Sequence, residues 1–596
     1  MAAGKPVHSG YSKGLQLERI NHRKLQVSQN SPSYDGILGT VPWVRDGPHE
    51  APMGDTELTM PKVFFVHEKK SILVEQGLTI LEAARRAGVM IESPCNAIGS
   101  CGKCRVHTGA CSVLACQTPV EKDLTVSIPD YTGENQSLQI LSRGSDFTYE
   151  KQPYISKRFL DGKTLVYGGE TFLGAEGGDT TAEQYGLAVD IGTTTLVTAL
   201  VDLQRGKTIA VESVLNPQAA YAQDVLGRIH FASQGEGLSV LHRVFLEALE
   251  QMIRTLTTTN RVRRERIYEV VYSGNTTMLH LACGVDPVSL GQFPYKPKLF
   301  GGHHVSAEKL GISPFGLIWL PPIISAFVGA DISSGILASG LDEKQGSTLF
   351  IDIGTNGEMV LAKDGSLAAT STAAGPAFEG MNISCGMRAS RGAIASFSVH
   401  KGVPAYELIG GSASGDDPPV GICGSGLLDI TGELLREGVI GKNGRFVPPE
   451  TGAYHETLGK CMGQQDGKSA FFITEKVYLA QRDIRQIQLA KGAIRCGIEM
   501  LLARFSMKAE DIASVEIAGS FGYHLKAANL FSIGLLPSEF AGKLVFLGNS
   551  SLTGGIAFLM NTGFRSKMME LVKRVDQVEL VNDKDFERTF ITYLRF

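Results

Sequence analysis

The chain has 596 residues, a formal net charge of −4 at pH 7 and a composition that is 43% hydrophobic and 20% charged. This length predicts several domains of about 100–200 residues each. The slightly acidic balance argues against a nucleic-acid partner, which needs a clustered basic face. No stretch approaches the roughly 18 apolar residues of a membrane span, and no charged start is followed by the apolar run of a secretion signal. We therefore expect a cytoplasmic protein with no membrane partner.

The first 59 residues mix Gly, Pro, Ser, His and charged residues without a helical or strand period. Such a stretch lacks the apolar pattern that could bury surface, so residues 1–59 are predicted to form a disordered extension. Regular patterning begins at Met60, which is also a candidate translation start. Residues 60–130 are predicted to form the first folded domain.

That domain begins with two short apolar runs, at 62–66 and 71–74, that predict strands. Thr79 then caps a predicted helix that ends at Gly88, and a closing strand is expected at 124–129. Between the helix and the last strand lies a cluster that holds five of the ten cysteines of the chain, at positions 95, 101, 104, 111 and 116. Disulfide scaffolds are small and Cys-dense throughout, so this uneven distribution favours a metal centre in a reducing compartment.

The order of strand, strand, helix and cysteine loop resembles the β-grasp ferredoxins that carry a 2Fe–2S cluster. The resemblance implies that four thiolates hold the two irons, and that they belong to Cys95, Cys101, Cys104 and Cys116. The interval between the last two is shorter than in ferredoxins of this type, so Cys111 stays an alternative fourth ligand, although the Leu-Ala-Cys-Gln context favours Cys116. Structural zinc is the alternative metal, but the C-x5-C first spacing favours iron and sulfur.

Residues 131–183 are polar and Gly-rich, with one short β-like run at 163–167. We expect a flexible connector, which as a coil would span on the order of 40 Å. Such a connector would let the cluster domain change its position relative to the rest of the chain.

An α/β pattern follows, and within it the sequence Asp-Ile-Gly-Thr occurs twice, at 190–193 and at 352–355. Each copy ends one apolar strand and precedes another, which predicts a tight hairpin whose N–H groups and hydroxyls face phosphate oxygens. The carboxylates of Asp190 and Asp352 are placed to hold the water shell of Mg²⁺. Two copies indicate an internal duplication, with lobes of about 184–345 and 346–596.

A third element, at 515–522, predicts a strand that enters a Gly-rich turn placed to lie against an adenosine. With the two hairpins it resembles the phosphate-1, phosphate-2 and adenosine motifs of the superfamily of sugar kinases, heat-shock ATPases and actin, over roughly residues 184–575. We therefore expect a multidomain α/β protein in which a β-grasp ferredoxin domain precedes a duplicated, actin-like ATPase domain at 184–596. The candidate nucleotide-binding residues are Gly192, Thr193, Thr194, Thr195, Gly354, Thr355, Asn356, Gly357, Gly424, Gly426, Gly519, Ser520 and Gly522.

Several of these residues have an equally simple structural explanation. Asp331 is a candidate for orienting the attacking water, yet an Asp at a helix start also serves as a cap. Glu358 could contact Mg²⁺ through water or merely line the hairpin. Gly424 and Gly426 could bind nucleotide at a helix start or allow close packing there.

The combination of ferredoxin and ATPase resembles one family, the reductive activators of corrinoid proteins. The segments that carry this resemblance in the ATPase part are 216–218, 274–278, 293–295, 374–380, 421–426 and 548–552. Members usually have a middle domain between ferredoxin and ATPase, and here we expect that region to be reduced to the connector. The resemblance implies a homodimeric enzyme that uses Mg-ATP to pass one electron from its 2Fe–2S cluster to the Co(II) corrinoid of a methyltransferase-system protein, restoring Co(I).

The sequence lacks an Asp-x-His-x-x-Gly corrinoid signature and a Gly-x-Gly-x-x-Gly turn after a strand, so the cobalt and the low-potential electron donor are expected on partner proteins. Three alternative functions stay open. They are an activator of another low-potential metalloenzyme of the acyl-CoA dehydratase type, a metabolite kinase, and a nucleotide-dependent redox sensor.

Overall fold

The computed structural model describes residues 60–91, 93, 97, 99, 104–109, 111–128, 150–411, 418–519, 525–580 and 583–596. The predicted extension at 1–59 and the first part of the predicted connector lie outside the described residues. None of the helices in the described ranges combines the length and apolarity that a bilayer span needs.

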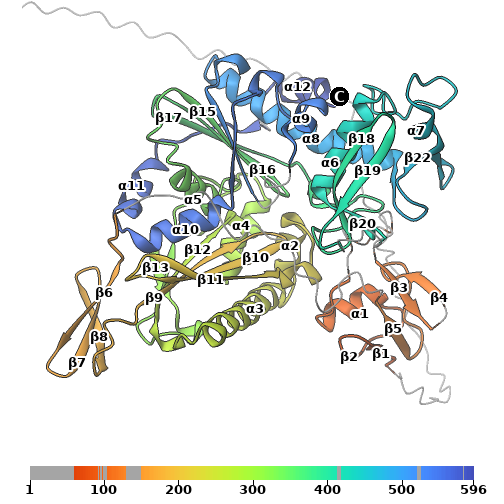
Figure 1. Ribbon diagram of the computed structural model, residues 1–596. Helices are drawn as coiled ribbons and strands as arrows, with labels where there is room; N and C mark the ends of the chain where they lie inside the picture. Colours follow the sequence, from red (N-terminus) through yellow and green to blue (C-terminus); the bar gives the residue numbers. More distant parts are fainter. Residues whose placement is uncertain are drawn as a thin grey trace, which may run out of the picture. The chain divides into compact units, whose positions relative to one another are not determined.

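The first domain is a five-stranded sheet with one helix packed on it (Figure 1). Its strand order is β2-β1-β5-β3-β4, with β1 parallel to β5 and antiparallel to β2. Thr79 accepts a hydrogen bond from the backbone N–H of Glu82 and so starts the helix, whose apolar face is buried. This is the expected β-grasp arrangement. The elements are β1 (Lys62–Phe65), β2 (Lys70–Leu73), α1 (Ile80–Arg86), β3 (Arg105–Thr108), β4 (Cys111–Leu114) and β5 (Leu124–Ser127).

A three-stranded antiparallel sheet follows: β6 (Ile155–Leu160), β7 (Lys163–Gly168) and β8 (Thr171–Gly177). The prediction of a flexible connector is therefore wrong for its second part, 150–183. Ile155 and Val166 are buried against Tyr268, and the buried ammonium of Lys157 lies 3.1 Å from the carboxylate of Glu176. These contacts order a segment whose own sequence is polar, because its apolar partner lies about a hundred residues later.

Two six-stranded sheets form the centre of the remaining part of the chain, and they repeat one topology. The first has the order β11-β10-β9-β12-β14-β13 and the second β25-β24-β15-β16-β17-β26. In each, an antiparallel three-strand meander is followed by a parallel strand that pairs with the first strand of the meander. This repetition confirms the predicted duplication. The strands are β9 (Tyr185–Ile191), β10 (Thr195–Asp202), β11 (Lys207–Leu215), β12 (Ile267–Gly274), β13 (His303–Ser306), β14 (Leu317–Leu320), β15 (Ser347–Ile353), β16 (Gly357–Lys363), β17 (Ser366–Thr372), β24 (Ser514–Ala518), β25 (Leu544–Gly548) and β26 (Asp576–Gln577).

Helices cover both sheets and fill the space between them (Figure 1). α3 buries one apolar face against the first sheet, and α8 does the same on the second. α5 and α10 pack against each other in a core shared by both sheets. The helices are α2 (Val225–Ala232), α3 (Gly237–Asn260), α4 (Thr276–Ala282), α5 (Ala330–Ser339), α6 (Gly424–Arg436), α7 (Glu456–Lys460), α8 (Gln481–Arg504), α9 (Ala527–Ser532), α10 (Ser550–Met560), α11 (Gly563–Leu571) and α12 (Phe586–Thr592).

Smaller sheets extend the second lobe. β18 (Ala393–His400), β19 (Val403–Leu408) and β20 (Gly421–Ile422) form one, and β21 (Met462–Gln465), β22 (Lys468–Phe472) and β23 (Tyr478–Ala480) form another. β20 leads directly into α6, whose first turn therefore lies next to β18. This placement brings the start of α6 to the cavity described below.

Candidate functional site

A cavity lies between the two large sheets, where the hairpin turns of both lobes face each other. The β9–β10 turn contributes Gly192, Thr193, Thr194 and Thr195, and the β15–β16 turn contributes Gly354, Thr355 and Asn356. The starts of α5, α6 and α10 close the remaining sides. The two copies of Asp-Ile-Gly-Thr, far apart in sequence, are thus brought to a single cavity.

In both hairpins the N–H of the glycine donates across the turn, although the second turn is one residue shorter. The N–H of Gly192 donates to the carbonyl of Thr195 at 2.9 Å, and the N–H of Gly354 donates to the carbonyl of Asn356 at 2.9 Å. A Cβ on Gly192 would lie 2.7 Å from the Thr195 carbonyl oxygen, which is too close for any side chain. The first glycine is therefore required by the tightness of the turn.

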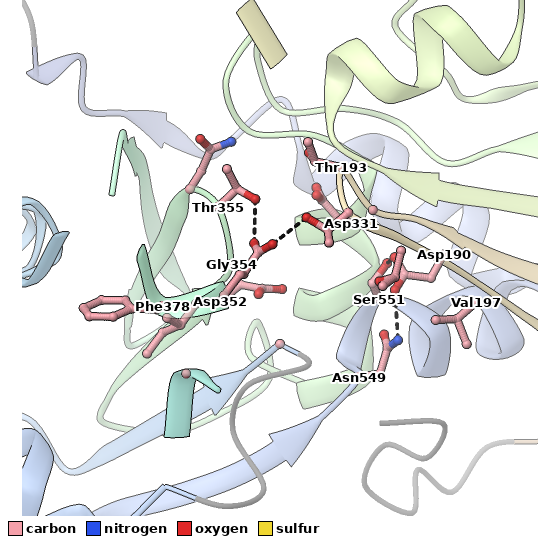
Figure 2. A pocket seen from close by; sticks show the side chains of 18 of the residues that line it. Asp190, Thr193, Val197, Asp331, Asp352, Gly354, Thr355, Phe378, Asn549 and Ser551 are labelled. Atoms are coloured by element: carbon pink, nitrogen blue, oxygen red, sulfur yellow. Dashed lines mark hydrogen bonds between the residues drawn. The ribbon is translucent and has the colours of Figure 1, made fainter. Parts of the chain in front are cut away.

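Four carboxyl groups lie around the cavity, on β9 (Asp190), α5 (Asp331), β15 (Asp352) and β16 (Glu358). Glu358 is buried, and the three aspartates are half-buried. Figure 2 shows the three aspartates projecting toward the same space from separate elements. Asp190 accepts hydrogen bonds from Ser551 at 2.8 Å and from Asn549 at 2.9 Å, so α10 and the residue before it fix this carboxylate.

Burial raises the pKa of all four carboxyls, because a charged carboxylate loses its hydration there. The pKa of Asp331 rises to about 8, from burial first and then from the charge of Asp352. The pKa of Asp352 rises to about 7, from burial and then from the charge of Asp190. For Glu358 the pKa lies well above its usual range, from burial and the charges of Asp331 and Asp352.

Such a set of like charges fits a divalent cation, which would restore the ionised forms. Among the described residues, no three His, Cys, Asp or Glu side chains converge closely enough to hold a bare metal ion. The donor set therefore fits a cation that keeps part of its water shell and meets the carboxylates through water.

The predicted nucleotide-binding glycines fall into two groups. Gly424 and Gly519 line the cavity, and Gly519 has φ +101°, with its Cβ position 2.8 Å from an oxygen of Asp352. Gly426 packs on β18 instead, because a Cβ there would lie 2.1 Å from the carbonyl oxygen of Ile394. Gly357 likewise packs inside the second lobe, its Cβ position lying 2.9 Å from Ile494 and Thr372. The predicted residues Ser520 and Gly522 lie outside the described part of the chain.

Sequence reasoning missed other cavity residues, notably Asn275, Glu379, Arg388, Asn549 and Ser551. Four of the five lie in or beside segments that carry the family resemblance, and this position was the one available sign of a functional role. The neighbouring sequence did not indicate what that role would be. Glu379 accepts hydrogen bonds from Thr194 and Thr355, each at 2.5 Å, so one carboxylate contacts both hairpins. Arg388 is the one cationic side chain among the described residues that line the cavity.

A buried arginine supports the first hairpin from behind. Arg228 is fully buried and donates to the carbonyl of Thr193 at 2.5 Å, and also to the carbonyl of Ala222 and the side chain of Gln218. Burial lowers its pKa to about 9, opposed by the charges of Asp224 and Glu379. A positive charge held this deeply beneath the turn favours an anion at the turn.

In the first domain, the Sγ atoms of Cys104 and Cys116 lie 3.2 Å apart, and both residues are buried. Cys111 is exposed at the start of β4. Gln117 donates to the carbonyl of Ala97 at 2.9 Å and so ties the cysteine loop to the second buried thiol. Cys95 and Cys101 lie outside the described residues. The adjacent buried thiols fit a thiolate-bound cluster and favour Cys116 over Cys111 as a ligand.

Comparison with known proteins matches three stretches of the chain. The description "2Fe-2S iron-sulfur cluster binding domain" matches residues 64–123, "RACo middle region" matches 185–344, and "C-terminal domain of RACo the ASKHA domain" matches 346–596. The chain is 32% identical over 425 residues to the "Corrinoid activation enzyme RamQ" of Eubacterium limosum, covering 69% of this chain and 70% of that protein. It belongs to the family of corrinoid-protein reductive activators.

Two further similar proteins have names that refer to the same activity. The chain is 24% identical to the "[Co(II) methylated amine-specific corrinoid protein] reductase" of Methanosarcina barkeri, over 69% of this chain and 77% of that protein. A solved "Reductive activator for corrinoid,iron-sulfur protein" is 29% identical, with a TM-score of 0.68, covering 90% of this chain and 98% of that one. The matched middle region coincides with the first lobe, so the expectation that it is reduced to a connector is wrong.

Proposed function

We propose that this family member is an ATP-dependent reductive activator that transfers one electron from a 2Fe–2S cluster to the Co(II) corrinoid of a methyltransferase-system protein, restoring Co(I). The observation that carries the proposal is the presence, in one chain, of a ferredoxin domain with adjacent buried thiols and of an acidic cavity between two duplicated hairpins. Its relatives are named for corrinoid activation and corrinoid-protein reduction.

The cluster would be held by Cys95, Cys101, Cys104 and Cys116, and it supplies one electron at about −400 mV. If the potential of the corrinoid lies below that of the cluster, each ~59 mV of difference lowers the equilibrium constant of the one-electron transfer tenfold. ATP hydrolysis is therefore coupled to the transfer to offset this difference in potential. The coupling requires that nucleotide change how the protein binds the oxidised and reduced partner.

We assign separate roles in nucleotide binding and hydrolysis to the residues of the cavity. The N–H groups and hydroxyls of the two hairpins bind the phosphate oxygens. Asp190 and Asp352 orient the water shell of Mg²⁺, with Asn549 and Ser551 fixing the first carboxylate. Asp331 ionises once the acidic cavity gains a cation, and it then orients the attacking water and accepts its proton.

We further infer that an external low-potential reductase or ferredoxin reloads the cluster, since the sequence shows no flavin or nicotinamide motif. A cytoplasmic location and a homodimeric state complete the proposal. The location rests on the cysteine distribution and the dimer on the resemblance to the family, and gel filtration with light scattering tests the dimer.

The test mixes the full-length protein with a Co(II) corrinoid protein and a low-potential reductant under anaerobic conditions. Co(I), followed by its absorption spectrum, should form only with Mg-ATP. Asp352→Asn should slow ATP turnover and Co(I) formation together, while its 2Fe–2S centre stays reducible. Cys101→Ser should retain nucleotide binding and stop electron delivery.

Asp364→Asn is the matched control. Asp364 lies in the exposed β16–β17 turn, at the opposite end of β16 from the hairpin that lines the cavity. It should behave like the wild type. Equal Co(I) formation without ATP would contradict coupling, and transfer of the γ-phosphate to a small molecule would point to a kinase.

A further inference from the structure

The carboxylate of Glu379 links the two lobes at the cavity. Oε2 accepts a hydrogen bond from the hydroxyl of Thr194, and Oε1 accepts one from the hydroxyl of Thr355, each at 2.5 Å. The two hydroxyls come from equivalent turns of the duplicated lobes. One side chain therefore joins the two hairpins, with one oxygen on each.

The same hydroxyls are the groups that the proposed function gives to phosphate oxygens. A carboxylate and a phosphate are both anions that accept hydrogen bonds, and a hydroxyl proton can serve only one acceptor at a time. Glu379 thus satisfies, within the protein, donors that a triphosphate would otherwise satisfy.

The charges around the hairpins make the competition stronger. The cavity already holds four carboxyls besides Glu379, and Arg388 is the single cationic side chain among its described lining residues. The guanidinium of Arg228 lies under the first hairpin and makes its hydrogen bonds to neutral acceptors. Its field favours one anion at the turn. Glu379 supplies such an anion, and a phosphate group would replace it.

The backbone around Glu379 allows the side chain to be released without disturbing the core. Glu379 ends a short 3₁₀ turn (Pro376–Glu379) that lies between Gly375 and Gly380, both with φ +77°. Phe378 anchors the turn, since it is 1% exposed. The glutamate extends from this fixed turn on three rotatable bonds, so a rotamer change can withdraw its carboxylate.

We propose that Glu379 is a positioning residue that connects the two phosphate hairpins in the nucleotide-free protein and is displaced by the phosphates of Mg-ATP. This inference rests on the proposed nucleotide binding and adds to it a specific exchange of anions. The contact between the lobes then runs through Glu379 before nucleotide binds and through the phosphates afterwards. Glu379 lowers nucleotide affinity, because each binding event must break its two hydrogen bonds.

The experiment measures the affinity of full-length wild type and Glu379→Gln for Mg²⁺ with a slowly hydrolysed ATP analogue, by calorimetry, together with melting temperatures with and without the ligand. The amide keeps the size but loses the charge and one acceptor. We expect the variant to bind the analogue about tenfold more tightly, which is about 1.4 kcal/mol. Its ligand-free melting temperature should fall, while its ligand-bound melting temperature stays near that of the wild type.

Glu407→Gln, on the exposed face of β19, is the matched control and should change neither quantity. Glu379→Asp, which keeps the charge on a shorter side chain, should lower the ligand-free melting temperature without the full gain in affinity. Weaker or unchanged binding by Glu379→Gln overturns the inference, since a purely structural link or a cation ligand gives one of those results. Failure of the wild type to bind the analogue overturns the proposed function itself.

Discussion

The carboxyl groups of the cavity make the stability of the protein depend on pH. The folded-state pKa of Asp352 is about 7 and that of Asp331 about 8, both above the ordinary value of 3.8. Between about pH 4 and pH 8 the folded state therefore holds more protons than the unfolded state, and the free energy of unfolding falls as pH rises. Each carboxyl contributes at most about 1.4 kcal/mol per pH unit.

We predict that the melting temperature of the nucleotide-free protein falls between pH 5.5 and pH 8.5, and that the stabilisation by Mg²⁺ with an ATP analogue grows over the same range. A cation favours the ionised carboxylates, so its binding must release more protons at low pH. Differential scanning calorimetry at several pH values measures both trends. Asp331→Asn should flatten them, and a ligand effect that is independent of pH would contradict the prediction.

The cysteine loop gives a second prediction at the level of single residues. Cys116 is 5% exposed and lies beside Cys104, whereas Cys111 is exposed on a strand. Cys116→Ser should abolish or alter the spectrum of a plant-type centre in anaerobically purified protein, and Cys111→Ser should leave it nearly intact. Iron and sulfide analysis should give about two of each per chain. Zinc in place of iron would contradict the cluster, and the reverse mutational result would make Cys111 the ligand.

Among the structural elements, the β6–β8 sheet owes its order to one buried polar network. Glu176 lies 3.1 Å from Lys157 and 2.7 Å from Arg266, and it accepts a hydrogen bond from Tyr268 at 2.6 Å. Lys157 in turn donates to the Tyr268 hydroxyl at 2.7 Å. The network joins the β6–β8 sheet to β12 and to the turn that precedes it.

Tyr268→Phe should lower the free energy of unfolding by about 1–3 kcal/mol, because it removes one hydrogen bond each from the buried side chains of Glu176 and Lys157 while the ring stays in place. Urea denaturation measures the loss. Tyr167→Phe, on the neighbouring strand β7, is the matched control and should change stability by less than about 0.5 kcal/mol. Equal stability of the two variants would show that the network does not hold the sheet.

At the scale of the whole molecule, the two lobes are joined by α5 and α10, which pack backbone to backbone. A Cβ on Gly554 of α10 would lie 2.0 Å from the carbonyl oxygen of Ser334 in α5. The next residue along α5, Gly335, lies against the ring of Phe350 in β15, with its Cβ position 2.7 Å from the ring. The start of α10 also carries Ser551, which fixes Asp190.

Gly554→Ala should therefore separate the helices, lower stability by roughly 3 kcal/mol and reduce ATP turnover. Gly459→Ala in the short helix α7 is the control, since its Cβ position has no neighbour closer than 3.7 Å. There the higher helix propensity of alanine should leave stability unchanged or raise it by up to about 1 kcal/mol. Thermal unfolding and steady-state ATPase rates measure both effects, and a stable, fully active Gly554→Ala protein would show that the contact can relax.

The sequence alone determined the features that depend on neighbours along the chain. The strand, turn and strand around each Asp-Ile-Gly-Thr copy form locally, since Gly192 and Gly354 close their turns within four residues. The fold class followed from the family resemblance that the cysteine loop and the duplicated motifs carry, and the family comparison confirmed it. The roles of the individual site residues stay predictions, although most of the described ones line a single cavity.

Tertiary structure decided which side chains meet across long stretches of chain. Gly424 faces the cavity and Gly426 packs on β18, because two residues turn a helix by about 200° and the sequence does not show which face is which. Glu379 accepts a hydrogen bond from Thr194, which lies 185 positions away in the sequence. Arg228 of helix α2 supports the β9–β10 turn through the carbonyl of Thr193. The second part of the predicted connector is folded for the same reason. Its partners, the buried Tyr268 and the half-buried Arg266, come from the first lobe, and only packing of the two segments supplies the free energy that orders it.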